Sequence, residues 1–176
     1  MAKAAVVFRS EYGSTKRYAS YIAEKLQADL FSTDEVKDIS VYDTIVYGGG
    51  IYAGALNGSD WLQKNKEALL HKKLIIFTCG ISDPQEPKNL ESIHAYLKKN
   101  LTEELVCHAK VFCFHGALDY KKLKFTHKGI MTVVFQALKR KKEHSAQDEV
   151  MLKCRDVPVD FVDVSQAEAL IEFVKE

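Results

Sequence analysis

The chain has 176 residues, of which 47% are hydrophobic and 28% are charged, and its formal net charge is +1 at pH 7. These values are ordinary for a soluble globular protein and give no reason to expect a nucleic-acid partner. No apolar run reaches the roughly 18 residues that span a bilayer. The first residues also show no signal-peptide core, so we expect a single cytoplasmic domain over residues 1–176.

Apolar runs alternate with amphipathic helical stretches along the chain. The runs predict five strands, at residues 4–8, 29–32, 44–48, 73–79 and 109–115. Helices are expected at residues 15–26, 59–70, 86–100 and 165–175, and in the first of them Tyr18, Ile22 and Leu26 form one buried face. Strands that are apolar throughout and alternate with helices predict an α/β fold, with a doubly wound five-stranded parallel sheet and helices on both faces.

An insertion interrupts this alternation after the fifth strand, at about residues 117–163. Residues 125–142 predict an extra helix, and residues 149–163 an irregular or partly extended segment. Charge is segregated here, because residues 120–142 hold eight Lys or Arg and no Asp or Glu, whereas residues 143–176 hold nine acidic and three basic residues. A helical insertion on a regular fold is a common place for specific function to be added.

The loop that follows the first strand and leads into a helix reads Ser10-Glu11-Tyr12-Gly13-Ser14-Thr15-Lys16. Its hydroxyl groups, a glycine that permits close backbone approach and the positive end of a helix together suit a phosphate. The simpler interpretation is an ordinary helix cap with a turn before it. The glycine and lysine spacing of nucleoside-triphosphate loops is absent, so we predict a phosphate site that needs no metal.

The loop after the third strand reads Gly48-Gly49-Gly50-Ile51-Tyr52-Ala53-Gly54. The glycines match the dinucleotide-binding fingerprint, but they follow the third strand rather than the first, and no carboxylate ends the next strand. We therefore reject a dinucleotide site. Tyr52, an aromatic residue among glycines, is suited to stack on a flat ring, and an exposed turn tyrosine is the alternative.

The loop after the fourth strand reads Thr78-Cys79-Gly80-Ile81. The backbone N–H groups of Cys79 and Gly80 are expected at the edge of a bound ring. The four cysteines do not resemble a disulfide framework, and Cys79 is expected to be a small buried residue without a redox role. Cys107, Cys113 and His115 are expected on one strand face, but their spacing is not a zinc pattern and we predict no metal site.

The three loops together describe a ligand with a phosphate at one end and a planar ring at the other, since the carboxyl ends of parallel strands meet at one edge. In SEYGSTK, GGGIYAG and FTCG the chain resembles flavodoxins. The likeness is greatest to the flavodoxin-domain group that includes menaquinone-dependent protoporphyrinogen oxidase, which has a comparable basic segment after a motif such as Gly116-Ala117-Leu118. The resemblance implies a flavoprotein that binds FMN. The cofactor-binding residues that it implies are Ser10, Glu11, Tyr12, Gly13, Ser14, Thr15, Gly50, Ile51, Tyr52, Ala53, Gly54, Thr78, Cys79 and Gly80.

The chain departs from the flavodoxin pattern in two places. Tyr12 stands where flavodoxins usually have a third hydroxyl residue, so the resemblance does not imply a side-chain bond to the phosphate from this position. Residues 81–83 lack the aromatic side chain that often covers the second face of the ring. The resemblance therefore implies a ring face that is open to a substrate.

Two functions follow from this resemblance. The first is an FMN-dependent oxidoreductase that passes electrons from an organic substrate, such as a protoporphyrinogen, to a quinone-type acceptor. The second is a flavodoxin-type electron carrier between partner proteins. Carrier flavodoxins are typically acidic, so the net charge of +1 and the basic insertion favour the enzyme. No residue is identified as a catalytic acid or base.

The basic helix expected in the insertion is apolar on more than one face, so it needs more than one partner. One interpretation is that it packs on the sheet or forms a homodimer contact while its lysines are solvated. The other is that residues 120–142 rest on anionic lipid at the inner face of the membrane. That contact would bring the cofactor close to a membrane quinone.

Overall fold

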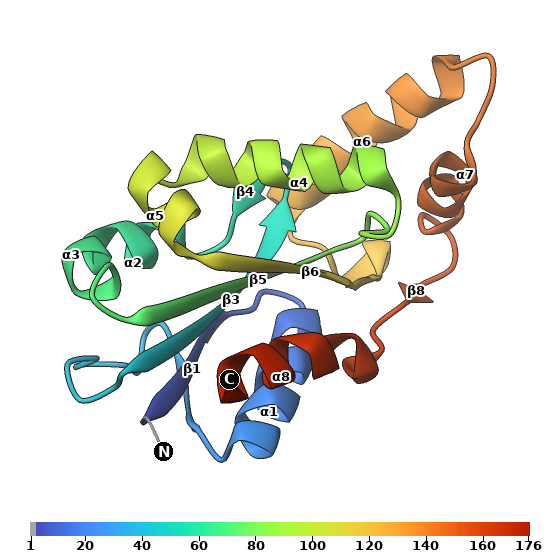
Figure 1. The fold of residues 1–176 in the computed structure, drawn as a ribbon. Coiled ribbons are helices and arrows are strands. Elements are labelled where there is room, and N and C mark those ends of the chain that lie inside the picture. The colour runs from blue at the N-terminus through green and yellow to red at the C-terminus, as the bar shows by residue number, and fades with distance from the viewer. Residues whose placement is uncertain (1–2) are drawn as a thin grey trace.

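The computed structural model describes residues 3–176 and has a central parallel sheet with the strand order β2-β1-β3-β5-β6 (Figure 1). Every pairing between these strands is parallel, and a short strand, β4 (Ala55–Leu56), pairs antiparallel with the end of β3. The sheet confirms the predicted α/β fold. Its strands are β1 (Ala4–Arg9), β2 (Asp29–Ser32), β3 (Thr44–Tyr52), β5 (Lys73–Gly80) and β6 (Lys110–His115).

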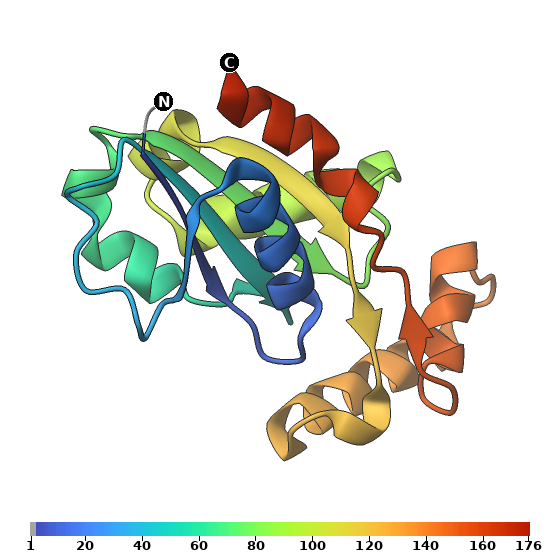
Figure 2. The same cartoon turned by 90° about the horizontal axis from the view of Figure 1, so that it is seen from below.

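Helices cover both faces of the sheet (Figures 1 and 2). One face carries α1 (Ser14–Leu26) and α8 (Glu168–Lys175), which bury Ile22 and Leu170 against the strands. The other face carries α2 (Ser59–Lys64), α3 (Lys66–Leu69), α4 (Pro87–Asn100) and α5 (Glu103–His108). Because both faces are covered, neighbouring strand residues are buried on opposite sides, and this explains why the strands are apolar throughout.

Strand β3 runs further than the sequence predicted, because the glycines assigned to a loop continue the sheet. Gly48 pairs with Phe8 on one side and with Phe77 on the other, and Gly50 pairs with Cys79. The loop proper begins only at Ala53, whose φ is 51°. The helix expected at residues 59–70 is also divided, at Asn65, between α2 and α3.

The insertion contains β7 (Ala117–Leu118), a 3-10 turn (Tyr120–Lys122), α6 (Phe125–Arg140), α7 (Ala146–Lys153) and β8 (Val159–Asp160). β7 and β8 pair antiparallel and close the base of the insertion, and a second 3-10 turn (Val164–Ala167) leads into α8. The expectation of an irregular segment from residue 149 was wrong in its first part, because α7 forms there. Its start is fixed by a capping box between Ser145 and Asp148.

α6 lies beyond the carboxyl ends of the strands and not on either face of the sheet (Figures 1 and 2). It packs on α7, and Phe135 on its inner side contacts Tyr120 with ring centroids 5.5 Å apart. The insertion therefore stands at the edge where the sequence predicts a ligand. None of the helices within residues 3–176 has the length and apolar character that crossing a bilayer requires.

Candidate functional site

A cavity of about 320 Å³ opens at the carboxyl ends of β1, β3, β5 and β6. Its volume is at the lower end of the range for small-molecule sites, roughly 300–1,000 Å³. All three loops singled out in the sequence reach it, and so do α4 and α6. The predicted residues that line it are Tyr12, Ser14, Thr15, Ile51, Tyr52, Ala53, Gly54, Cys79 and Gly80.

Five predicted residues lie outside the lining of this cavity. The Ser10 hydroxyl accepts the backbone N–H groups of Gly13 and Lys16, at 3.2 and 3.3 Å, so this side chain shapes the loop from within. Gly50 lies under the phenol end of the Tyr52 side chain. The others are Glu11, which lines a second hollow beside the first, Gly13, and Thr78, which is buried within β5.

The start of α1 is arranged to receive an anion. Gly13, the N-cap residue, has a left-handed φ of 99° and no side chain to cap the helix, and the Ser10 hydroxyl accepts only the N–H of Lys16 among the first three residues of α1. Among residues 3–176 no acceptor is found for the backbone N–H groups of Ser14 and Thr15, whereas the Ser14 hydroxyl accepts the N–H of Ala117 at 3.2 Å. Free N–H groups and the positive helix end together favour a phosphate over a plain cap.

Tyr52 lines the cavity, but its ring is part of an aromatic cluster that the sequence did not reveal. The ring stacks on His127 with centroids 5.4 Å apart and planes inclined by 17°. Tyr12 meets Tyr52 edge to face at 5.6 Å. Burial raises the pKa of the Tyr52 phenol. Tyr52 is therefore a packed wall residue rather than an exposed turn tyrosine.

His127 could not be found from loop motifs because it lies 115 residues after Tyr12, in the first turn of α6. Its Nδ1 is hydrogen-bonded to the Tyr12 hydroxyl, which also accepts the backbone N–H of Lys124 at 3.2 Å. The Lys124 side chain forms an ion pair with Glu11. The side chains of Tyr12 and Glu11 thus bind the insertion. This contact explains why Tyr12 stands where flavodoxins usually have a third hydroxyl residue.

The cysteines near the cavity are not arranged for chemistry of their own. Cys79 is 4% exposed, and burial raises the pKa of its thiol to about 12, so it stays protonated. The expected strand face shared by Cys107, Cys113 and His115 was wrong, because Cys107 lies in α5 and β6 begins only at Lys110. No group of three or more His, Cys, Asp and Glu side chains suited to a metal ion is found in the described part of the chain.

The outer wall of the cavity comes from α4 and the insertion, where no site residue was predicted. α4 contributes Ile93 and Tyr96, and the Tyr96 ring lies over Gly54. The insertion contributes Leu123, Ile130, Met131, Val134 and Met151. This wall is mostly apolar, and its only signal in the sequence is the helical spacing of Ile130, Met131 and Val134.

The chain is similar to several known proteins. An uncharacterized protein of Methanocaldococcus jannaschii is 34% identical over 79 residues, which are 43% of this chain and 53% of that protein. The chain therefore matches only about half the length of that curated relative. One similar solved structure is a flavoprotein in complex with FMN from Lactobacillus acidophilus NCFM, which is 13% identical over 65% of this chain and 93% of that one, with a TM-score of 0.48. Another is oxidised flavodoxin 2 from Bacillus cereus, which is 21% identical over 65% of this chain and 84% of that one, with a TM-score of 0.46.

A flavodoxin from the domain Archaea is 13% identical and covers 88% of this chain and 96% of its own, with a TM-score of 0.42. At these identities and TM-scores, the three likenesses carry no conclusion about this chain. The family comparison is more direct, because the flavodoxin domain profile matches residues 5–145. This match extends from β1 through the three loops and into the insertion, and the chain belongs to the flavodoxin domain family.

Proposed function

We propose that the protein is an FMN-dependent oxidoreductase of one flavodoxin-like domain, with residues 117–163 as its insertion. The phosphate of FMN would take the free N–H groups of Ser14 and Thr15, and its ring would lie between Ile51–Tyr52 and Cys79–Gly80. Membership of the flavodoxin domain family supports this assignment. When bound, FMN supplies the two-electron chemistry that the side chains of the chain lack.

The observation that carries the enzyme proposal is the apolar wall beside the ring site. Met131, Val134 and Met151 of the insertion face Ile93 and Tyr96 of α4 across one continuous cavity. An electron carrier needs only an exposed ring edge that a partner protein can approach. A cavity lined mostly by apolar side chains instead suits a flat organic molecule, and it limits the access of water to the reacting atoms.

The substrate and acceptor are proposed from the likeness to the protoporphyrinogen oxidase group. A protoporphyrinogen would give electrons to the flavin, and a quinone-type acceptor would remove them. The second candidate, an electron carrier, is supported by family membership and by the exposed basic helix, which could meet an acidic partner protein.

Turnover separates the two candidates. FMN-loaded protein should oxidise protoporphyrinogen with a menaquinone analogue as acceptor, at a rate above that of the flavin-free protein. A rate equal to the flavin-free control, together with rapid electron exchange with a redox protein, would favour the carrier. Met131→Asp is the matched variant, because it places a charge in the apolar wall away from the phosphate loop. It should slow turnover and leave FMN bound.

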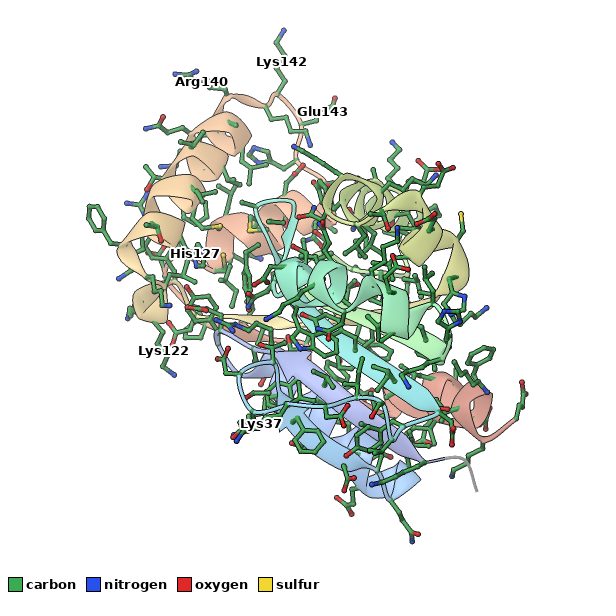
Figure 3. The ribbon with its side chains drawn as sticks, turned by 90° about the vertical axis from the view of Figure 1, so that its left-hand side faces the viewer. Lys37, Lys122, His127, Arg140, Lys142 and Glu143 are labelled. Carbon is green, nitrogen blue, oxygen red and sulfur yellow. The ribbon has the colours of Figure 1, made fainter. Side chains whose placement is uncertain are left out.

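The outer side of α6 supports a peripheral contact with an anionic membrane. Phe125 and Val133 are 92% and 66% exposed, and α6 contains no acidic residue. Arg140 and Lys142 extend away from the body of the molecule at its far end (Figure 3). Among residues 3–176 no ion pair is found for them or for Lys139, whereas Lys141 pairs with Asp148. An apolar face between free cations is typical of helices that lie on lipid.

Lys139→Glu combined with Lys142→Glu should abolish most binding to anionic vesicles. Each basic side chain near such a surface contributes about 1 kcal/mol, so two charge reversals should lower binding at least about tenfold. Sedimentation with anionic and neutral vesicles at low and high salt measures this. Lys37→Glu combined with Lys98→Glu, on exposed parts outside the insertion, is the control. Unchanged sedimentation of the first variant would rule out the lipid contact and leave the packing role of the helix. A concentration-dependent dimer that Val133→Asp abolishes would indicate a homodimer contact instead.

A further inference from the structure

Two neighbouring side chains of the phosphate loop leave the loop and hold the start of the insertion helix. The carboxylate of Glu11 pairs with the ammonium group of Lys124, the residue before α6. The Tyr12 hydroxyl accepts the N–H of Lys124 at 3.2 Å and is hydrogen-bonded to Nδ1 of His127. The loop and α6 are thus joined directly, and the Ser14 hydroxyl adds a third contact at the base of the insertion through the N–H of Ala117.

These contacts also build a wall of the cavity. The rings of Tyr12, Tyr52 and His127 lie between 5.4 and 5.7 Å from one another, and all three line the cavity. Figure 3 shows His127 at the start of α6, on the helix that stands away from the sheet. Because α6 packs mainly on α7 and on Tyr120, opening of the contacts between the loop and α6 would free the start of the helix and open this wall.

We propose that Tyr12 and His127 are positioning residues that couple the phosphate loop to α6, so that a phosphate bound in the loop holds α6 closed over the ring end of the cavity. The left-handed Gly13 and the two bonds to the Ser10 hydroxyl set the loop conformation. That one conformation presents the N–H groups of Ser14 and Thr15 to a phosphate and directs Tyr12 to α6.

The coupling is positive because phosphate binding and the contacts with α6 both need the same ordered loop. A phosphate that orders the loop removes part of the entropy lost when the Tyr12 and Glu11 contacts form. By linkage, the contacts with α6 must strengthen phosphate binding by the same factor. The inference rests on the proposed function only for the identity of the ligand, since inorganic phosphate in the loop should act in the same direction as FMN.

Hydrogen exchange at residues 129–138, with and without ligand, tests the coupling. In the unmodified protein, FMN and saturating inorganic phosphate should each slow exchange about fivefold, and riboflavin, which lacks the phosphate, should have a much smaller effect. Tyr12→Phe keeps the ring but removes the hydroxyl. It should abolish most of this protection and weaken FMN binding about fivefold. Thr132→Val, which removes a hydroxyl bonded within α6 to Lys128, is the control and should behave like the unmodified protein.

The outcomes separate the inference from the proposed function. FMN binding that leaves exchange in α6 unchanged, or equal protection in Tyr12→Phe, overturns the coupling and leaves the FMN site standing. Phosphate that protects α6 in a protein unable to bind FMN supports the coupling and overturns the proposed cofactor. Protection by riboflavin equal to that by FMN also overturns the coupling, because the ring and not the phosphate would then hold α6.

Discussion

Gly48→Ala should lower the free energy of unfolding by about 3 kcal/mol, near the upper end of the usual range for overpacking a core. A Cβ atom at Gly48 would lie 2.1 Å from Cζ of Phe77, which is fully buried. The Phe77 ring is held between Tyr18 and Phe114, with centroids at 6.5 and 5.3 Å, so it has little room to withdraw. Urea unfolding followed by circular dichroism measures the change.

Gly129→Ala is the matched control for this substitution, because the expected sign is opposite. Gly129 lies inside α6, and a Cβ atom there would meet nothing within 4 Å. Alanine should stabilise the helix by about 0.5–1 kcal/mol. An equal loss of stability in both variants, or none in Gly48→Ala, would show that the glycine in β3 does not serve close packing against Phe77.

Tyr52→Ala should weaken FMN binding by about 1–3 kcal/mol, which corresponds to roughly a 5- to 150-fold rise in Kd. The substitution removes a wall of the cavity and the ring on which His127 stacks. It should also shift the reduction potential of the bound flavin, because the ring site becomes better solvated. Fluorescence titration and a spectroscopic redox titration measure the two effects.

Thr15→Ala provides the comparison for Tyr52→Ala. Thr15 is 1% exposed, lies in the first turn of α1 and lines the cavity. Its substitution should weaken FMN binding and leave the visible spectrum unchanged, since the ring environment is intact. An unchanged dissociation constant and spectrum in Tyr52→Ala would place this tyrosine away from the ring.

The elements that follow from local patterns could be predicted from the sequence. The buried spacing of Tyr18 and Ile22 predicted α1, and the apolar runs predicted five parallel strands in the sheet. The glycines of β3 were assigned to a loop instead, because glycine is common in turns. Their true role depends on Phe77 and Leu56, side chains that approach only in the folded sheet. No local rule reveals such a close approach.

The part of the candidate site that lies within a single loop could be predicted from the residues of that loop. Ser14 and Thr15, which were predicted to bind a phosphate, line the cavity beside the segment between β1 and α1. The wall formed by His127, Met131 and Tyr96 was missed, because a helix placed beyond the sheet by a β7–β8 pairing has no signature within its own residues. Tyr12 looked like a defect in the phosphate loop, and its bonds to His127 and to the N–H of Lys124 give it a role in holding α6.

Identification of the flavin in the purified protein tests the FMN site most directly. The protein is denatured, the released chromophore is separated by chromatography, and the stripped protein is titrated with FMN, riboflavin and FAD. We expect FMN to be recovered in near one-to-one amount and to rebind more tightly than riboflavin, because FMN has the phosphate for the loop at Gly13 and riboflavin has none. Recovery of FAD, or a colourless protein that binds none of the three, would contradict it.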